Sequence, residues 1–142
     1  MKQFESGNLG KTIVIELERG DKVIEGIEKE LENAGVRNAL VVSAVGSIQK
    51  LIYHRPTTLG ASASDEYITV EAPMEIGSLT GSVFDGSGHF HIVASDTNNV
   101  YCGHLELGTE VLYLLEIVMV ELDGCNLERK ITPENVKKLF IK

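Results

Sequence analysis

Residues 88–105 have the sequence GHFHIVASDTNNVYCGHL, with apolar and β-branched residues on both sides of a polar segment. The polar segment, residues 96–99, consists of amino acids that favour turns, and two apolar runs around such a segment predict a β-hairpin. A turn centred between Thr97 and Asn98 would place His91 directly opposite His104. The hairpin therefore predicts antiparallel pairing in this part of the chain.

Three of the four histidines of the chain lie in this predicted hairpin. His89 and His91 share one face of their strand because strand side chains alternate, and His89 then lies diagonal to His104. Directly opposed Cβ atoms are about 5 Å apart and diagonal ones about 7–8 Å apart, so the three imidazoles converge. Neutral imidazole is the commonest protein ligand of zinc. The spacing predicts that His89, His91 and His104 bind zinc or another divalent transition metal.

Other residues near the hairpin leave alternatives open. A bulge at Gly103 would shift the register and move His104 to the opposite face. Cys102 alternates onto the face of His104, which makes it a possible further ligand. An H-x-H motif followed by an acidic residue, here Asp96, is also typical of cupin barrels, although Asp96 falls in the predicted turn. The isolated His54 is expected to be a surface residue.

Two glutamates are candidates for a supporting role at this site. Glu106 follows His104 by two residues and should therefore lie on the histidine face, opposite His89. It could be a metal ligand, a hydrogen-bond partner of a ligand, or a general base, and Glu75 is a second candidate base. Three histidine ligands leave a fourth position open to water or a small anion, as in catalytic zinc sites.

The composition fits one domain over residues 1–142. With 43% hydrophobic residues the chain can bury a core, and its formal net charge of −8 opposes a general affinity for nucleic acid. The basic residues near the C-terminus, including Lys137 and Lys138, are expected to be solvated. The start of the chain lacks the apolar run of a signal peptide and the two cysteines suit reduced thiols, so a cytoplasmic location is expected. The longest apolar run, residues 111–122, is too short to cross a membrane.

The pattern of apolar residues predicts an α+β fold, with a single domain, a mostly antiparallel sheet of about seven strands, and two or more helices. Apolar residues recur at helical spacing over residues 22–34. Thr132 and Pro133 form a helix-start signature, which predicts a second helix at the C-terminus. Residues 111–120 are apolar on both strand faces, so one face needs cover from a helix or from another subunit.

Four short motifs occur in a fixed order along the chain: ERGD at residues 18–21, VGSI at 45–48, EIGSLTG at 75–81, and HFH at 89–91 with GHL at 103–105. In this order and at these intervals, the chain resembles the PPC domain, also called the PCC domain, which plants and prokaryotes share. The resemblance extends over nearly the whole chain. It implies an α+β fold, a homotrimer and, as in some relatives, a metal at the positions of His89, His91 and His104.

The resemblance also implies a DNA-associated role, because plant members carry AT-hooks and stand-alone prokaryotic members are often described as DNA-binding. This chain lacks an RGRP hook, and Arg55-Pro56 is the nearest fragment. The plant partner-binding hexapeptide GRFEIL corresponds here to APMEIG, residues 72–77, without its arginine and phenylalanine. We predict a metal-binding, homotrimeric protein of regulatory, DNA-associated type that does not by itself bind duplex DNA. The alternative is a metal-dependent enzyme that acts on a small molecule.

Overall fold

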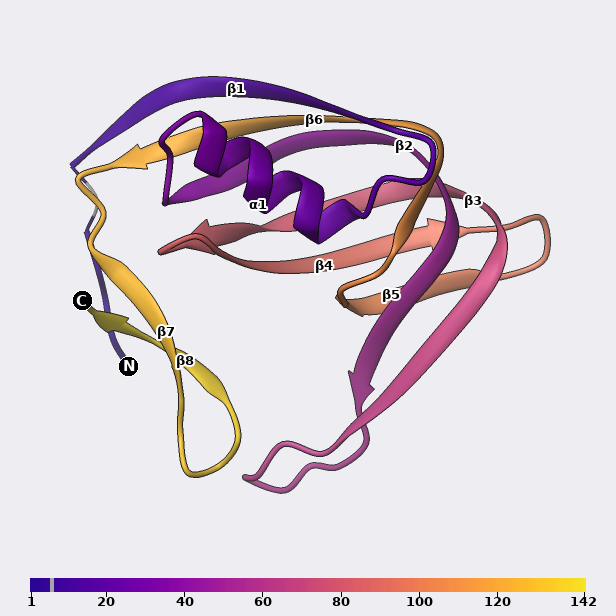
Figure 1. Cartoon of the computed structure of the whole chain (residues 1–142). Helices are drawn as coiled ribbons and strands as arrows, with labels where there is room; N and C mark the ends of the chain where they lie inside the picture. The colour runs from indigo at the N-terminus through magenta and orange to yellow at the C-terminus, as the bar shows by residue number, and fades with distance from the viewer. Residues whose placement is uncertain (6) are drawn as a thin grey trace.

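Eight strands and one helix make up the part of the chain that the computed structural model describes, residues 1–5 and 7–142 (Figure 1). Six strands form one antiparallel sheet in the order β1-β6-β2-β3-β4-β5, and the last two form a separate hairpin. The elements along the chain are β1 (Asn8–Glu18), α1 (Val23–Asn33), β2 (Ala39–Pro56), β3 (Asp65–Phe84), β4 (Ser87–Ser95), β5 (Val100–Leu105), β6 (Glu110–Asp123), β7 (Leu127–Ile131) and β8 (Lys137–Ile141).

The large sheet closes on itself at one end, because β5 pairs with β2 as well as with β4. Strands β2, β3, β4 and β5 thus form a ring in which each strand is paired with two of the others. Figure 1 shows that β2 and β3 curve strongly. The pairing of β2 is irregular between Ile48 and Lys50, which marks a bulge, and bulges bend the strand that carries them. The bend lets the second half of β2 meet β5.

Helix α1 packs its apolar face against the sheet. Its buried residues recur at the three- and four-residue spacing of one helix face, and they are Val23, Ile24, Ile27 and Leu31. Figure 1 shows α1 lying between β1 and β4, and it makes contacts with both strands. The helix predicted over residues 22–34 is therefore present.

The second predicted helix is wrong, and with it the α+β assignment: the chain is mostly β, with one helix among its described residues. Residues 132–136 form a turn in which Thr132 N–H donates to the Val136 carbonyl over 2.9 Å. Asn135 has a φ of 58°, so the backbone leaves the right-handed helical region after Pro133 and the chain reverses into β8. Proline suits the first position of a helix and the second position of a turn alike, so the motif did not distinguish the two.

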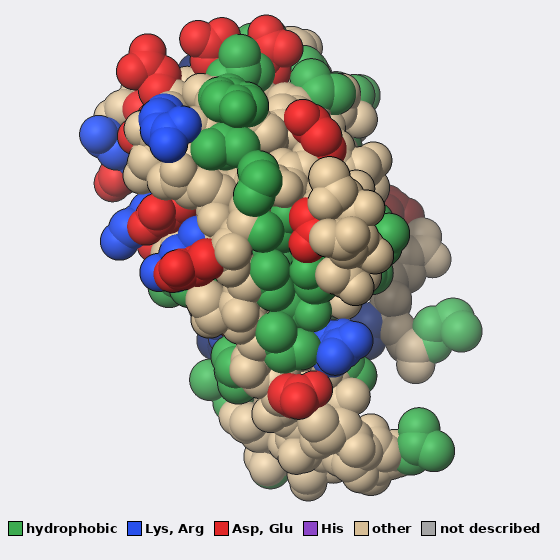
Figure 2. Space-filling model, turned by 90° about the vertical axis from the view of Figure 1, so that its right-hand side faces the viewer, with side chains coloured by type: hydrophobic (Ala, Val, Ile, Leu, Met, Phe, Trp, Pro, Cys, Tyr) green, Lys and Arg blue, Asp and Glu red, His purple; other side chains and the backbone are tan. Residues whose placement is uncertain are grey.

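Strand β6 places its two faces in different environments. One face is buried in the core, at Val111, Leu115, Ile117 and Met119. The opposite face of β1, β6 and β2 remains uncovered in the single chain. Its exposed apolar residues, which we call the outer apolar face, are Val14, Val42, Val45 and Leu114. Apolar side chains also form a band, with charged side chains on both sides, on the side of the molecule shown in Figure 2.

Among the described residues, we find no helix with the length and apolar character needed to cross a membrane.

Candidate metal centre

The hairpin of β4 and β5 has the register that the sequence predicted. His91 pairs with His104 and Val93 with Cys102, and no register shift interrupts this ladder. The carboxylate of Asp96 holds the turn by accepting hydrogen bonds from the N–H groups of Asn98 and Asn99, each over 2.7 Å. Asp96 therefore stabilises the turn, and the cupin interpretation, which would use it as a ligand, gains no support.

The three predicted ligands lie together beside this ladder. His89 and His91 bring their Nε2 atoms to 3.4 Å, and the His89 and His104 ring centroids are 4.6 Å apart. One ring nitrogen from each of the three side chains can be chosen so that all lie within 4.8 Å of one another. Nitrogens bound to zinc at about 2.0–2.1 Å in a tetrahedron are about 3.3–3.4 Å apart. The His89–His91 pair already has this spacing, and the nitrogen of His104 lies within 4.8 Å of both.

Burial favours the neutral imidazoles that a metal requires. The pKa of His104 is lowered to about 4, first by burial and then by the neighbouring His54. The pKa of His89 is also lowered, first by burial and then by the positive charge of Arg129. Protonation occupies the lone pair with which a ring nitrogen binds metal, so neutral rings at neutral pH are prepared for coordination.

The fourth histidine, His54, also belongs to this cluster, contrary to its expected surface position. It pairs with His104 across β2 and β5, and the two rings stack at a centroid distance of 4.3 Å. Only 17% of its side chain is exposed, and its Nδ1 lies 2.5 Å from Oε1 of Glu106. Its Nε2 lies 4.0 Å from Asp65. The position of His54 follows from the pairing of β2 with β5, two strands that are distant in the sequence. A local turn pattern contains no information about that pairing.

Gly103 makes the approach of these two strands possible. A Cβ atom at this position would lie 2.6 Å from the backbone oxygen of His54 and 2.6 Å from the ring of Tyr53, which is closer than real Cβ atoms come. The glycine therefore does not introduce a bulge that turns His104 away. It lets β5 pack closely against β2, which brings the His104 ring onto the His54 ring.

Glu106 supports the cluster from a position that differs from the prediction. The β4–β5 ladder ends at His91 and His104, so Glu106 has no paired position opposite His89. Its N–H instead donates to the Ile52 carbonyl over 2.9 Å, and Oε1 lies 4.0 Å from Nε2 of His104. His54, His104 and Glu106 consequently form a second group with atoms close enough to share an ion.

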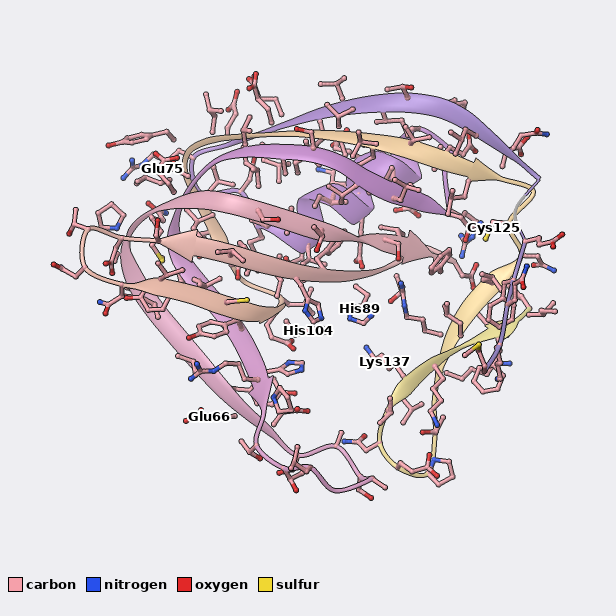
Figure 3. The ribbon with its side chains drawn as sticks, turned by 180° about the vertical axis from the view of Figure 1, so that it is seen from behind. Glu66, Glu75, His89, His104, Cys125 and Lys137 are labelled. Atoms are coloured by element: carbon pink, nitrogen blue, oxygen red, sulfur yellow. The ribbon has the colours of Figure 1, made fainter. Side chains whose placement is uncertain are left out.

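The other two candidates take no part in these groups. Cys102 is exposed on β5, and no ligand group among the described residues contains it. Glu75 pairs with Ser47 and Ser95. Figure 3 shows Glu75 well away from His89 and His104, so it is not placed to act as a base there.

A cavity of about 580 Å³ lies in front of the cluster. Three histidines, His54, His89 and His104, line it on one side, and the β7–β8 hairpin lines it on another. Hydrogen bonds tie this hairpin to the rest of the chain. Arg129 donates to the backbone oxygens of Ser82 and Ser87, and Ala63 N–H donates to the carbonyl of Glu134. The cluster thus faces an open space large enough for a small molecule.

A curved antiparallel sheet that closes into a ring and carries clustered imidazoles at a cavity defines a small β protein with a candidate metal centre. The chain belongs to the Plants and Prokaryotes Conserved (PCC) domain family, whose model matches residues 4–123.

Solved structures of similar proteins share the fold. The metal-containing protein AF0104 from Archaeoglobus fulgidus is 27% identical over 100% of both chains, with a TM-score of 0.83. A plant- and prokaryote-conserved (PPC) protein from Pyrococcus horikoshii is 22% identical over 96% of this chain and 95% of that chain, with a TM-score of 0.80. A protein from Bacteroides thetaiotaomicron named "putative DNA binding protein" is 16% identical over 96% of each chain, with a TM-score of 0.78. Among curated proteins, none matches this chain.

Proposed function

We propose that this protein binds one divalent transition metal ion, zinc in the first instance, through His89, His91 and His104. The observation that carries the proposal is the convergence of three imidazole nitrogens within 4.8 Å. The lowered pKa values of His89 and His104 support it, because they keep both rings neutral. The A. fulgidus relative, which is named as metal-containing, supports it independently.

The proposed ion has three protein ligands and an open fourth position, which we assign to water or a small anion. A zinc ion with such a position can lower the pKa of bound water or polarise a carbonyl group. The chain itself supplies Glu106 and His54 beside the ligands. We propose that this pair orients His104, because the His54 ring stacks on the ligand and the Glu106 carboxylate fixes His54.

Two roles are compatible with this centre. We propose a regulatory role in DNA-associated complexes, with a metal that need not be catalytic, because two solved relatives carry the name "putative DNA-binding protein". With a net charge of −8, the chain is not expected to contact the duplex by itself. The second candidate role is a metal-dependent enzyme acting on a small molecule, and the cavity in front of the histidines favours it.

The assembly that we propose is a homotrimer in which the outer apolar face is covered by a second copy of the chain. Four exposed apolar side chains on three adjacent strands support self-association, and the number three follows the family resemblance. We further propose that residues 1–142 act as one domain, because the β7–β8 hairpin lines the cavity. Two free cysteines suit a reducing compartment, so we propose the cytoplasm.

Elemental analysis of protein purified without an affinity tag tests the metal proposal. We expect about one equivalent of transition metal per chain, lost in a His91→Ala variant, because two imidazoles hold zinc much more weakly than three. The His54→Ala variant is the comparison: it removes an orienting imidazole but no proposed ligand, so it should still take up about one equivalent of metal, with an affinity lowered about tenfold. Less than a tenth of an equivalent, with no uptake of added zinc or cobalt, would refute the proposal.

Fluorescence anisotropy with a labelled duplex at about 0.15 M salt tests the DNA part of the proposal. We expect no saturable binding by this chain alone. Micromolar binding that weakens steeply with salt would contradict this expectation and would show direct contact with the phosphate backbone.

A further inference from the structure

Among the described residues, the lining of the cavity in front of the histidines includes one cation, Lys137, for which we find no acceptor on the protein. Lys137 is the first residue of β8 and lines the cavity. Figure 3 shows its side chain pointing from the hairpin toward His89. Within residues 1–5 and 7–142, no carboxylate forms an ion pair with Lys137, although three other lysines form such pairs: Lys130, Lys138 and Lys142.

The other charged groups around the cavity are already occupied. Arg129 donates to oxygens of Ser82 and Ser87 and lies over the ring of Phe84. Glu28 accepts a hydrogen bond from the N–H of Gly88 over 2.7 Å, and Glu106 contacts His54. These groups hold the cavity walls together. Lys137 is therefore the cation that remains available to a molecule entering the cavity.

Apolar side chains form another part of the lining. Ile24 from α1, Leu105 and Leu107 from around the end of β5, and Ile131 and Val136 from the hairpin all face this space. A cavity of about 580 Å³ with apolar walls and a few polar groups at one place is typical of sites for small organic molecules. The apolar lining suits the hydrocarbon part of such a molecule, and the Lys137 ammonium suits one negative charge.

We propose that this cavity binds a small organic carboxylate, whose anionic end lies between the Lys137 ammonium and the histidine cluster and whose hydrocarbon part contacts the apolar wall. The proposal rests on the proposed metal site and extends it by naming the class of molecule that reaches the open position. The ammonium of Lys137, the guanidinium of Arg129 and a divalent ion would supply one positive charge more than the carboxylates of Glu28, Asp65 and Glu106 remove, so one further anion can enter. Lys137 lies outside residues 4–123, the part that matches the family model, so it is a feature of the C-terminal hairpin.

Calorimetric titration with phenylacetate and with its uncharged amide, phenylacetamide, tests this proposal on zinc-loaded protein. We expect phenylacetate to bind at least about tenfold more tightly than the amide, because a charge-assisted hydrogen bond contributes about 1.5–3 kcal/mol. In a Lys137→Met variant, phenylacetate affinity should fall by about tenfold, with the amide unchanged. The cobalt-loaded protein gives a second readout, since an anion near the ion should change its visible spectrum.

The matched control is Lys138→Met, the neighbouring lysine on the opposite strand face, which pairs with Glu134. This control should bind phenylacetate like the unchanged chain. Equal binding of phenylacetate and phenylacetamide, or equal affinity in Lys137→Met, would overturn the carboxylate proposal and leave the metal proposal standing. Elemental analysis before the titration separates the metal proposal from the carboxylate proposal, because failure to take up metal would overturn both proposals.

Discussion

The histidine cluster and the outer apolar face lie on the same sheet, but they are completed in different ways. In the cluster, polar side chains from different strands contact one another. The ring of His54 in β2 stacks on the ring of His104 in β5, and its Nδ1 contacts the carboxylate of Glu106. On the outer apolar face, Val14 and Val42 remain 72% and 59% exposed to water. The cluster is therefore assembled by folding alone, whereas the apolar face requires another surface to remove it from water.

The two regions consequently depend on different physical quantities. The cluster depends on positions within a few tenths of an ångström, because ring stacking and metal ligation both have narrow distance limits. The apolar face depends on area, because the hydrophobic effect is proportional to the apolar surface removed from water. Substitutions in the two regions should therefore have different effects, on metal binding and stability in one case and on assembly in the other.

The largest expected effect follows from adding a side chain at Gly103. A Gly103→Val change forces atoms against His54 and Tyr53, where a Cβ alone would be 2.6 Å away. We expect the free energy of unfolding to fall by about 3 kcal/mol, as in other overpacked sites. Urea denaturation measures it.

The matched control for this change is Gly60→Val in the loop between β2 and β3. There the nearest group is the flexible Thr58 side chain at 3.3 Å, so stability should change by less than about 0.5 kcal/mol. Equal losses in the two variants would show that Gly103 does not control the β2–β5 approach.

The next effect concerns the outer apolar face. A charge introduced by Val42→Glu would be desolvated in a subunit interface but not in a single chain, so we expect the trimer to dissociate about 100-fold more readily. Light scattering over a range of concentrations measures the change. Leu59→Glu, at a fully exposed position in the loop between β2 and β3, is the control and should leave the mass unaltered. A single-chain mass for the unsubstituted protein would refute the proposed assembly.

A smaller effect is expected from Glu106→Gln. The amide keeps the size of the side chain but weakens its hold on His54, and partners of ligands of this kind typically change metal affinity by about tenfold. Competition with a chelating dye measures the zinc affinity, and Glu66→Gln, whose carboxylate is exposed and pairs with Arg55, is the control. Complete loss of zinc in Glu106→Gln would instead make Glu106 a ligand, as in the group of His54, His104 and Glu106.

The smallest effect is a pH dependence of stability in the metal-free protein. His104 has a folded pKa lowered to about 4 by burial, below the ordinary value of 6.5. The unfolded chain therefore binds more protons between these values, so stability is full above pH 7 and decreases as the pH falls toward 4. From about pH 7.5 to about pH 6.0, the loss should stay below about 1 kcal/mol. Urea midpoints at both values measure it, and a His104→Gln variant that keeps the same slope would contradict this cause.

Local sequence patterns were sufficient to predict the hairpin and its register. Asp96 and the residues after it define the turn, and alternation then places His91 opposite His104 without further information. The same reasoning failed for Glu106, because the ladder ends before it and the backbone turns to bond with Ile52. A strand pattern does not reveal where its partner stops.

Long-range packing explains the other errors. His54 looks isolated in the sequence, and only the pairing of β2 with β5 brings it to His104. Thr132 and Pro133 are compatible with a helix or a turn, and the left-handed Asn135 with pairing between β7 and β8 selects the turn. Both outcomes depend on contacts between separate segments of the chain, and local propensities do not predict such contacts.

Closure of the ring formed by β2, β3, β4 and β5 also affects where a strand from another chain could add to the sheet. Each strand of the ring is paired on both edges over part of its length, which shortens the row of free backbone groups that an aggregating chain could extend. In the described six-stranded sheet, β1 alone has a single neighbour. It carries Lys11, Glu16 and Glu18, and charged side chains on an edge strand oppose edge-to-edge addition. In the six-stranded sheet, the strand with a free edge along its whole length is thus a charged one, on the side of the sheet away from the ring, while each strand of the β7–β8 hairpin has a single neighbour.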